Sequence, residues 1–234
     1  MQYVKIKDAI VEQIDAGMLM PRQKLPAERK LAESFDTTRV TLREALSLLE
    51  AEGKIYREDR RGWFISPAPL RYDPTQTLNF TNMALTQNRQ PKTELVSAKA
   101  VIANKQATRL LKLKPFSDVY RVDRVRYLDN RPVVYVTNYI RPELFPNLLD
   151  FDLSQSLTDL YREHYATQYQ TIHYRISTSS LLGEMAQALR ATSGTPAMVV
   201  ERVNYNQKGE LIDCDIEYWR HDAITIESIA ELKR

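Results

Sequence analysis

Residues Thr37–Ile55, TTRVTLREALSLLEAEGKI, place hydroxyl and guanidinium groups around the start of a predicted short helix. Thr38 and Thr41 can each donate a hydrogen bond to a phosphate through the hydroxyl or contact the methyl group of thymine. The guanidinium groups of Arg39 and Arg43 can each donate twice to O6 and N7 of guanine. Because backbone N–H groups at a helix start add phosphate contacts, this stretch predicts contact with double-stranded DNA.

Two further sets of charged residues have the spacing of strand residues that share a face. Arg124 and Arg126 are two apart and can clamp the oxygens of an anion. Asp213, Asp215 and Glu217 alternate in the same way and can meet an ammonium group. Two alternatives stay open for these residues. The strand faces can simply be solvated, or the acids can hold a divalent metal or act as a general acid and base.

The elements that would position the first set are three helices and a hairpin. Helical spacing of apolar residues predicts helices near 4–14, 25–35 and 42–49, with Pro26 at the start of the second. The runs KIYRE at 54–58 and GWFIS at 62–66 predict two short strands around a basic tip. This order is typical of a winged helix-turn-helix, and a plain helical hairpin is the alternative.

A second domain is predicted after a proline-containing linker. The predicted boundaries are 1–67 for the first domain, 68–76 for the linker and 77–234 for the second domain. β-branched and aromatic runs around polar turns predict long hairpins at 117–140 and 197–227. Helices are predicted at 81–90, 104–111, 156–165 and 183–191. The expected fold class is α+β, with an antiparallel sheet and helices packed on it.

Composition limits the class of protein. The chain has 234 residues, 43% of them hydrophobic and 27% charged, with a formal net charge of +3, which is typical of an ordinary globular protein. The lone Cys214 excludes an internal disulfide, and the three histidines lack metal-ligand spacing, so we expect neither a metal nor a cofactor. No apolar run approaches membrane-spanning length, so a cytoplasmic location without a membrane partner is expected.

The segment AGMLMPRQKLPAERKLAESFDTTRVTLREALSLLEAEGKIYREDRRGWFI, residues 16–65, resembles the DNA-binding domain of the GntR superfamily of bacterial transcription regulators. The resemblance implies operator contacts, and we add Arg61 from its place in the wing. The predicted DNA-binding residues are Arg29, Thr38, Arg39, Thr41, Arg43, Arg61 and Gly62. One departure is Arg22, where the family often has glycine in a turn.

Residues 77–227 resemble the effector-binding domain of the HutC subfamily, which shares its fold with chorismate lyase. The resemblance implies that the Arg-x-Arg pair binds a ligand phosphate. The predicted effector-binding residues are Asn79, Phe80, Thr81, Arg124, Arg126, Ser156, Asp213, Asp215 and Glu217. The subfamily's sugar-phosphate sensors look to use a glutamate where this chain has Val136, which favours a smaller ligand.

Two stretches, RRGWFISPAPLRYDPTQTLNF and DIEYWRHDAITIE, look closer still to regulators of 2-aminoethylphosphonate utilisation. The function predicted from the resemblance is a homodimeric, non-enzymatic regulator that binds a roughly palindromic operator under the control of 2-aminoethylphosphonate or a related phosphonate or phosphate. Three alternatives stay open for the second domain: a sensor of a sugar phosphate or another metabolite, a lyase-like enzyme, and a dimerisation module.

Overall fold

A computed structural model describes residues 1–76 and 78–231, and the chain divides into two compact units. Unit 1 comprises Met1–Arg71, Ser180–Pro196 and Arg220–Thr225, and unit 2 comprises Tyr72–Ser179, Ala197–Trp219 and Ile226–Arg234. Residue 77, at which the second domain was predicted to begin, and residues 232–234 at its end lie outside the described residues.

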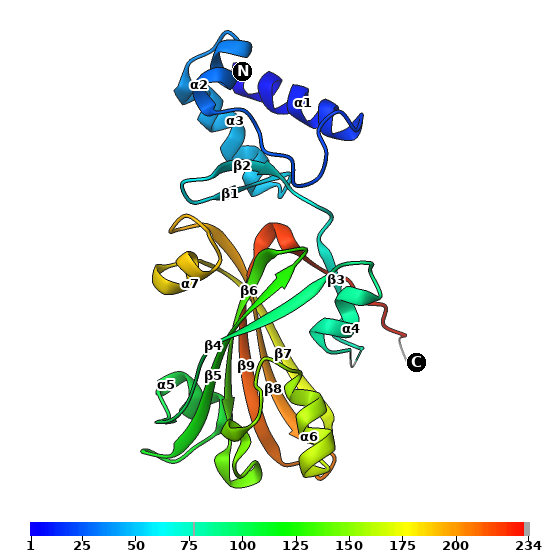
Figure 1. Cartoon of the computed structure of the whole chain (residues 1–234), viewed down its shortest axis with the longest axis vertical. Coiled ribbons are helices and arrows are strands. Elements are labelled where there is room, and N and C mark those ends of the chain that lie inside the picture. The colour runs from blue at the N-terminus through cyan, green and yellow to red at the C-terminus, as the bar shows by residue number, and fades with distance from the viewer. Residues whose placement is uncertain (77, 232–234) are drawn as a thin grey trace. The chain divides into compact units, whose positions relative to one another are not determined.

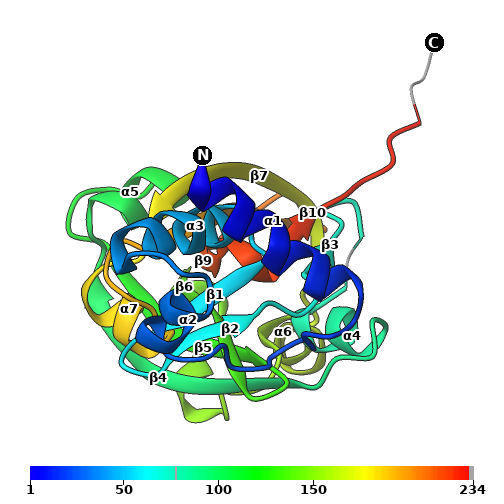
Figure 2. The same ribbon diagram turned by 90° about the horizontal axis from the view of Figure 1, so that it is seen from above.

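The predicted order of three helices and a hairpin is confirmed in unit 1 (Figures 1 and 2). The elements are α1 (Gln2–Asp15), α2 (Glu28–Ser34), α3 (Arg39–Ala51), β1 (Ile55–Glu58) and β2 (Gly62–Ile65). Strands β1 and β2 pair antiparallel, with Tyr56 opposite Phe64. This is the winged helix-turn-helix arrangement that the sequence predicted.

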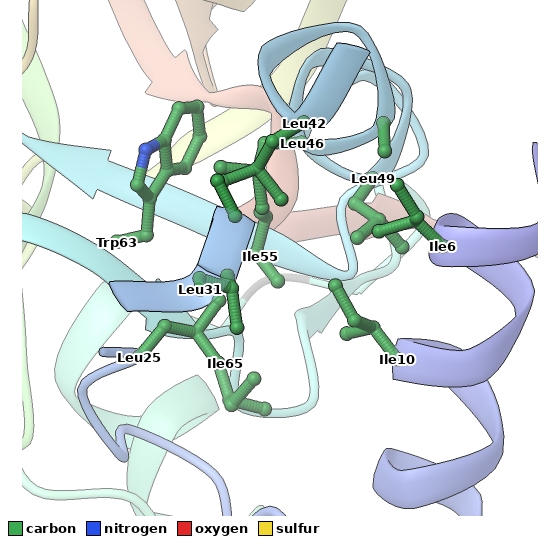
Figure 3. Packing of buried hydrophobic residues seen from close by; sticks show 12 residues of the cluster. Ile6, Ile10, Leu25, Leu31, Leu42, Leu46, Leu49, Ile55, Trp63 and Ile65 are labelled. Atoms are coloured by element: carbon green, nitrogen blue, oxygen red, sulfur yellow. The ribbon is translucent and has the colours of Figure 1, made fainter. Parts of the chain in front are cut away.

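The core of this part of unit 1 is built by one apolar stripe from each element. Leu42, Leu46 and Leu49 of α3 are fully buried at helical spacing, and they meet Ile6 and Ile10 of α1. Figure 3 shows these side chains pointing toward one another and toward residues of α2, β1 and β2. The opposite side of α3 is therefore left to carry polar groups.

The start of α2 differs from the prediction, and the backbone at Arg22 shows how the turn before α2 forms without a glycine. Helix α2 begins at Glu28 with Ala27 as N-cap, so Pro26 lies outside the helix and not at its first residue as predicted. Arg22 has a φ of 69°, in the left-handed region that favours glycine, and its N–H donates to Ile65 O at 2.7 Å. The turn thus has the backbone conformation of a glycine turn although it carries an arginine.

Unit 1 also contains α7 (Gly183–Ala188) and the short 3-10 helix η3 (His221–Ala223). Strand β3 (Leu70–Tyr72) pairs with β10 (Ile224–Ile226) in a two-stranded sheet. Strand β3 lies inside the stretch predicted as a linker, and its Leu70 is fully buried. Residues 68–76 are therefore not wholly without regular structure.

Unit 2 is built on a six-stranded sheet with the order β4-β5-β6-β9-β8-β7 (Figure 1). The strands are β4 (Pro91–Ile102), β5 (Asp118–Leu128), β6 (Arg131–Ile140), β7 (Tyr169–Ser180), β8 (Pro196–Asn206) and β9 (Leu211–Arg220). The pairs β4–β5, β5–β6 and β6–β9 are antiparallel. The two predicted hairpins form the four central strands, whereas the edge strands β4 and β7 were not predicted.

Helices cover both faces of this sheet. Tyr139 of β6 packs in one core with α5 (Lys105–Leu111), and the next residue, Ile140, packs in another with α6 (Leu157–Tyr165). Because successive strand residues point to opposite faces, α5 and α6 cover opposite faces. Unit 2 also contains α4 (Phe80–Leu85) and the 3-10 helices η1 (Pro142–Leu144) and η2 (Leu148–Asp150).

Within residues 1–76 and 78–231, no helix is long and apolar enough to cross a membrane. The same residues contain no group of three or more histidine, cysteine, aspartate or glutamate side chains that could hold a metal ion.

Candidate functional site

The start of α3 is capped by one of the predicted DNA-binding residues. Thr38 is the N-cap, and its Oγ1 accepts a hydrogen bond from the backbone N–H of Thr41 at 3.2 Å. The two threonine hydroxyl oxygens lie 3.1 Å apart. Thr38 therefore satisfies a free N–H group of the helix while its side chain stays exposed.

The two arginines of α3 are held differently. Arg39 is exposed and has no polar partner among the described residues. Arg43 donates through Nε to Glu28 Oε2 at 2.7 Å, which leaves its two Nη groups available, and its side chain is 64% exposed. The other carboxylate oxygen of Glu28 accepts from Trp63 Nε1 at 3.2 Å. Burial alone would raise the pKa of Glu28, but the bonds from Arg43 and Trp63 hold that pKa below its ordinary value.

The hairpin β1–β2 presents a further arginine. Arg61 forms an ion pair with Glu58, and its guanidinium carbon lies 5.8 Å from the centre of the Phe64 ring. Gly62 has a φ of 101°, which a side chain would strain. Of the seven predicted DNA-binding residues, Arg29, Thr38, Arg39, Arg43 and Arg61 are exposed, and Thr41 and Gly62 are half-buried.

The charged residues predicted to bind an effector lie on one face of the sheet in unit 2. Arg124 is opposite Val136, and Val136 is opposite Glu217, so these residues form a row across β5, β6 and β9. In the next rows Val134 is opposite Trp219, and Asn138 is opposite Asp215. Cross-strand neighbours share a face, so the alternation on both strands brings the two charged sets together.

Arg124 is the buried cation of this face, with 2% of its surface exposed. Its Nη1 donates to Gln155 O at 3.0 Å and its Nη2 to Asn138 Oδ1 at 2.9 Å, while Nε has no hydrogen-bond partner. No carboxylate of the described residues forms an ion pair with it. Burial and then the positive charge of Arg126 lower the pKa of Arg124 to about 9. The atoms bonded to it are therefore neutral oxygens, and the negative charge of Asp215 only partly opposes the lowering of its pKa.

Arg126 and the neighbouring acids are paired with each other. Arg126 Nη1 lies 3.3 Å from Glu217 Oε1, and its guanidinium carbon lies 5.1 Å from the centre of the Phe80 ring. The other oxygen of Glu217 accepts from Trp219 Nε1 at 2.8 Å. Arg202 donates through Nε to Asp215 Oδ2 at 2.7 Å, and its Nη2 lies 3.5 Å from Glu217.

Asp213 differs from the other two acids because no arginine contacts it in the described structure. Its Oδ2 accepts from the hydroxyls of Tyr161 at 3.0 Å and Tyr169 at 2.7 Å, and its Oδ1 accepts from Asn204 Nδ2 at 2.8 Å. Burial and the charge of Asp215 raise the pKa of Asp213 to about 6, although the three hydrogen bonds oppose this shift. Solvated strand faces were one alternative, and they are excluded because each of the three acids is at most 1% exposed.

Two helix starts meet near Arg124. Asn79 caps α4 through its Oδ1, and its Nδ2 lies 3.3 Å from the Oγ of Ser156, which caps α6. The residue before Ser156 is Gln155, whose carbonyl accepts from Arg124. The contacts therefore join Asn79, Ser156 and Arg124, and Phe80 is joined to Arg126. Thr81 is exposed and lies outside this set of contacts.

Several polar partners in this site were not predicted. They are Asn138, Gln155, Tyr161, Tyr169, Arg202, Asn204 and Trp219. A signal for two of them exists, because Arg202 and Asn204 alternate on the strand that precedes Asp213–Glu217 in the same predicted hairpin. Among the described residues of this face, Arg124 is a buried cation that contacts no acid, and Asp213 is a buried acid that contacts no arginine. A ligand with a negative group could therefore compensate the charge of Arg124.

Comparison with known proteins gives two family matches. Residues 2–65 match the bacterial regulatory proteins of the gntR family, and residues 86–225 match the UTRA domain. The uncharacterized HTH-type transcriptional regulator YihL of Escherichia coli K12 is 29% identical over 94% of each chain. The HTH-type transcriptional repressor NagR of Bacillus subtilis is 26% identical over 95% of this chain and 92% of its own.

A solved structure is similar over nearly the whole chain. PhnF from Mycobacterium smegmatis has a TM-score of 0.68 and 24% identity, and the match covers 97% of this chain and 100% of that one.

A further sequence relative is the probable fructoselysine utilization operon transcriptional repressor of Escherichia coli K12. It is 22% identical over 96% of this chain and 92% of its own.

Proposed function

Because the chain belongs to the gntR-family regulators that carry a UTRA domain, we propose that an anionic phosphonate or phosphate controls its binding to a palindromic operator. The two domains make the chain a transcriptional regulator that binds DNA and a small-molecule effector, and its relatives are regulators and not enzymes. The operator contacts, the effector and the domain boundaries at 67 and 77 are the parts that we propose.

The proposed DNA contacts combine base recognition with phosphate binding. Arg39 and the Nη groups of Arg43 would enter a major groove from the start of α3, which is the part of a recognition helix that meets base edges; their exposure supports this. Arg61 and Gly62 form the wing contact, and Arg29 and the two threonines bind the backbone. Since one helix reads only a few base pairs, a homodimer on two half-sites would supply the specificity.

The buried charge of Arg124 supports an anionic effector. A buried guanidinium without an acid is unfavourable, and a phosphonate or phosphate oxygen would compensate it through a charge-assisted hydrogen bond to the unpartnered Nε. Arg126 can turn toward the same anion because Glu217 keeps Trp219 and Arg202 as partners. The start of α6 at Ser156 adds N–H groups that favour negative charge.

Asp213 is the acid that we propose for the ammonium end of 2-aminoethylphosphonate. It is the member of the acid set that no arginine contacts, and the tyrosine hydroxyls that now donate to it can rotate away. Asp215 and Glu217 already have arginine partners, so an ammonium there would have to displace a guanidinium. Phosphonoacetaldehyde, which lacks the ammonium, would gain nothing from Asp213.

A thermal-shift and calorimetry panel tests the effector. The ligands are 2-aminoethylphosphonate, ethylphosphonate, phosphonoacetaldehyde, glucose 6-phosphate and inorganic phosphate, and the variants are Arg124→Lys and Asp213→Asn. We expect binding of 2-aminoethylphosphonate that Arg124→Lys weakens at least about tenfold, as for a lost charge-assisted contact. Undiminished affinity in Arg124→Lys would refute the anion site. Equal affinity of wild type and Asp213→Asn for the aminophosphonate would refute the ammonium contact alone.

A phosphorylated sugar derivative is the second candidate effector. The probable fructoselysine utilization operon repressor among the relatives favours it, since fructoselysine is a sugar derivative. The same Arg124 site would hold its phosphate. Glucose 6-phosphate in the panel separates the two, because binding of the sugar phosphate without binding of any phosphonate would establish the second candidate.

A further inference from the structure

Arg220 is a buried arginine at the end of β9 that no proposed contact uses. It belongs to unit 1, and its side chain is 1% exposed. Nη1 donates to Leu189 O at 2.8 Å, and Nη2 donates to Arg57 O at 2.7 Å. One planar guanidinium therefore joins the residue that ends α7 to strand β1 of the wing.

Arg220 also begins a stack of side chains that ends at a predicted DNA contact. Its guanidinium carbon lies 5.5 Å from the centre of the Tyr56 ring, and Tyr56 stacks on Phe64 with ring centres 5.4 Å apart and planes at 17°. On Phe64 lies the guanidinium of Arg61, at 5.8 Å. Both cations are within the distance at which an aromatic ring attracts a positive charge. We call Arg220, Tyr56, Phe64 and Arg61 the wing column.

Other contacts in unit 1 hold the hairpin at the same place. The backbone N–H of Asp59, at the turn of the wing, donates to Arg190 O at 2.9 Å. Ser66, which follows β2, donates through its Oγ to Asp222 Oδ2 at 3.2 Å. The other oxygen of Asp222 lies 3.7 Å from Arg220 Nε. An isolated two-stranded hairpin is marginally stable, so such outside support determines where the wing lies.

We propose that Arg220 is a positioning residue for DNA binding, and that the wing column sets the place at which Arg61 meets the operator. This inference rests on the proposed DNA contact of the wing. Arg220 itself makes no contact with DNA under this proposal. Its hydrogen bonds to Leu189 O and Arg57 O hold β1 in place. The stacked rings of Tyr56 and Phe64 then support the guanidinium of Arg61.

Arginine is needed at this position because of its geometry. The guanidinium carries two Nη groups at a fixed angle, and it bonds two carbonyl oxygens on different segments. A lysine keeps the charge but offers a single nitrogen, which cannot reach both oxygens in the same way. Arg220→Lys therefore removes the fork without leaving Asp222 beside a neutral side chain.

A double-mutant cycle on operator affinity is the test. The operator is the duplex that the full-length wild-type chain selects from a random library, and the variants are Arg61→Ala, Arg220→Lys and the double variant. We expect each single change to weaken binding about tenfold and the double change to weaken it no further, because both remove one contact. In each, the slope of log affinity against log salt should fall by about 1.

Phe64→Leu removes the ring between Tyr56 and Arg61 without changing a buried charge. This variant replaces Arg220→Lys in the cycle if the lysine variant does not fold. Hydrogen exchange of residues 55–65 should be faster in either variant, while exchange in the central strands β5 and β6 stays at the wild-type rate. Additive losses, about a hundredfold in the double variant, would overturn the proposal. Failure of the wild-type chain to select any duplex would instead refute the proposed function.

Discussion

The arginines of α3 and those of the central sheet are the same residue type in opposite environments. Arg39 is exposed and has no polar partner in the described part of the chain, and Arg43 uses one nitrogen for Glu28 and keeps most of its side chain exposed. Arg124 and Arg202 are largely buried and bonded to groups of their own unit. The first pair is open to a partner outside the chain, whereas most of the nitrogens of the second pair are already bonded within unit 2.

This difference teaches how each surface can bind an anion. If α3 binds DNA as we propose, a phosphate or base at Arg39 replaces only water, so affinity should depend strongly on salt. In the sheet an effector must replace or complete hydrogen bonds that already exist, so specificity depends on which buried charge has no opposite charge in contact with it among the described residues. Arg124 is that charge, and Asp213 is its negative counterpart.

The largest expected effect is on stability in the sheet. Arg202→Met leaves Asp215, which is fully buried, without its arginine, and we expect the free energy of unfolding to fall by about 3 kcal/mol. Urea denaturation measures it. The matched control is Arg175→Met on the exposed edge strand β7, which should change stability by no more than about 0.5 kcal/mol. Equal effects of the two changes would remove the contrast between paired and unpaired arginines.

The second effect is a pH dependence of the Asp213 site. The pKa of Asp213 rises from 3.8 to about 6 on folding, so between about pH 4 and pH 6 the folded state holds a proton that the unfolded state has released. Rising pH through this window therefore removes stability, by up to about 3 kcal/mol for a shift of two units.

Asp213→Asn lacks this titration, so its stability relative to wild type should increase as the pH rises from about 4 to 7. Denaturation curves of both proteins at each pH measure the difference and cancel the titration of the other acids. A difference that does not change with pH would show that the surroundings of Asp213 do not disfavour its charge.

The third effect is on DNA. Arg39→Ala should weaken operator binding by about 1–3 kcal/mol and relax base preference at one position, since it removes the base contact that we propose. It should leave the unfolding free energy unchanged within about 0.5 kcal/mol, because Arg39 has no partner in its unit. Arg175→Ala is the control for a lost surface charge. Unchanged operator affinity of Arg39→Ala at fixed salt would refute the assignment.

The smallest effect concerns Thr38, which is exposed at the start of α3 but has a structural role. Thr38 is exposed but caps α3, so Thr38→Ala should lower the unfolding free energy by about 1 kcal/mol. Thr38→Ser keeps the hydroxyl and should remain close to wild type. A stability loss in the serine variant as large as in alanine would show that the cap is not the cause.

Much of the fold could be predicted because its apolar residues are periodic. Leu42, Leu46 and Leu49 gave α3 its face, and the β-branched runs gave the central strands of the sheet. The edge strands β4 and β7 were not predicted because their residues are exposed or half-buried. They therefore lack the apolar alternation of a strand with one buried face. The short strand β3 was not predicted for another reason, since the prolines and polar residues on either side of it are typical of a linker.

The candidate site could be predicted only in part. Alternation placed Arg124, Arg126 and the three acids on one face, but not their partners, because these lie on other strands and helices. Whether an acid meets an arginine or two tyrosines depends on register and on how α6 packs, and neither is visible in local spacing. The cap at Thr38 and the left-handed backbone of Arg22 likewise depend on their surroundings.

The central claim is that an anion at Arg124 controls how the arginines of α3 meet an operator. Fluorescence anisotropy of the selected operator, titrated with the full-length chain with and without 2-aminoethylphosphonate or glucose 6-phosphate, tests it most directly. We predict that one ligand changes the operator affinity of wild type by at least about fivefold, and that Arg124→Lys binds the operator but loses this change. No specific binding at low salt, or an equal response to ligand in Arg124→Lys, would contradict the account.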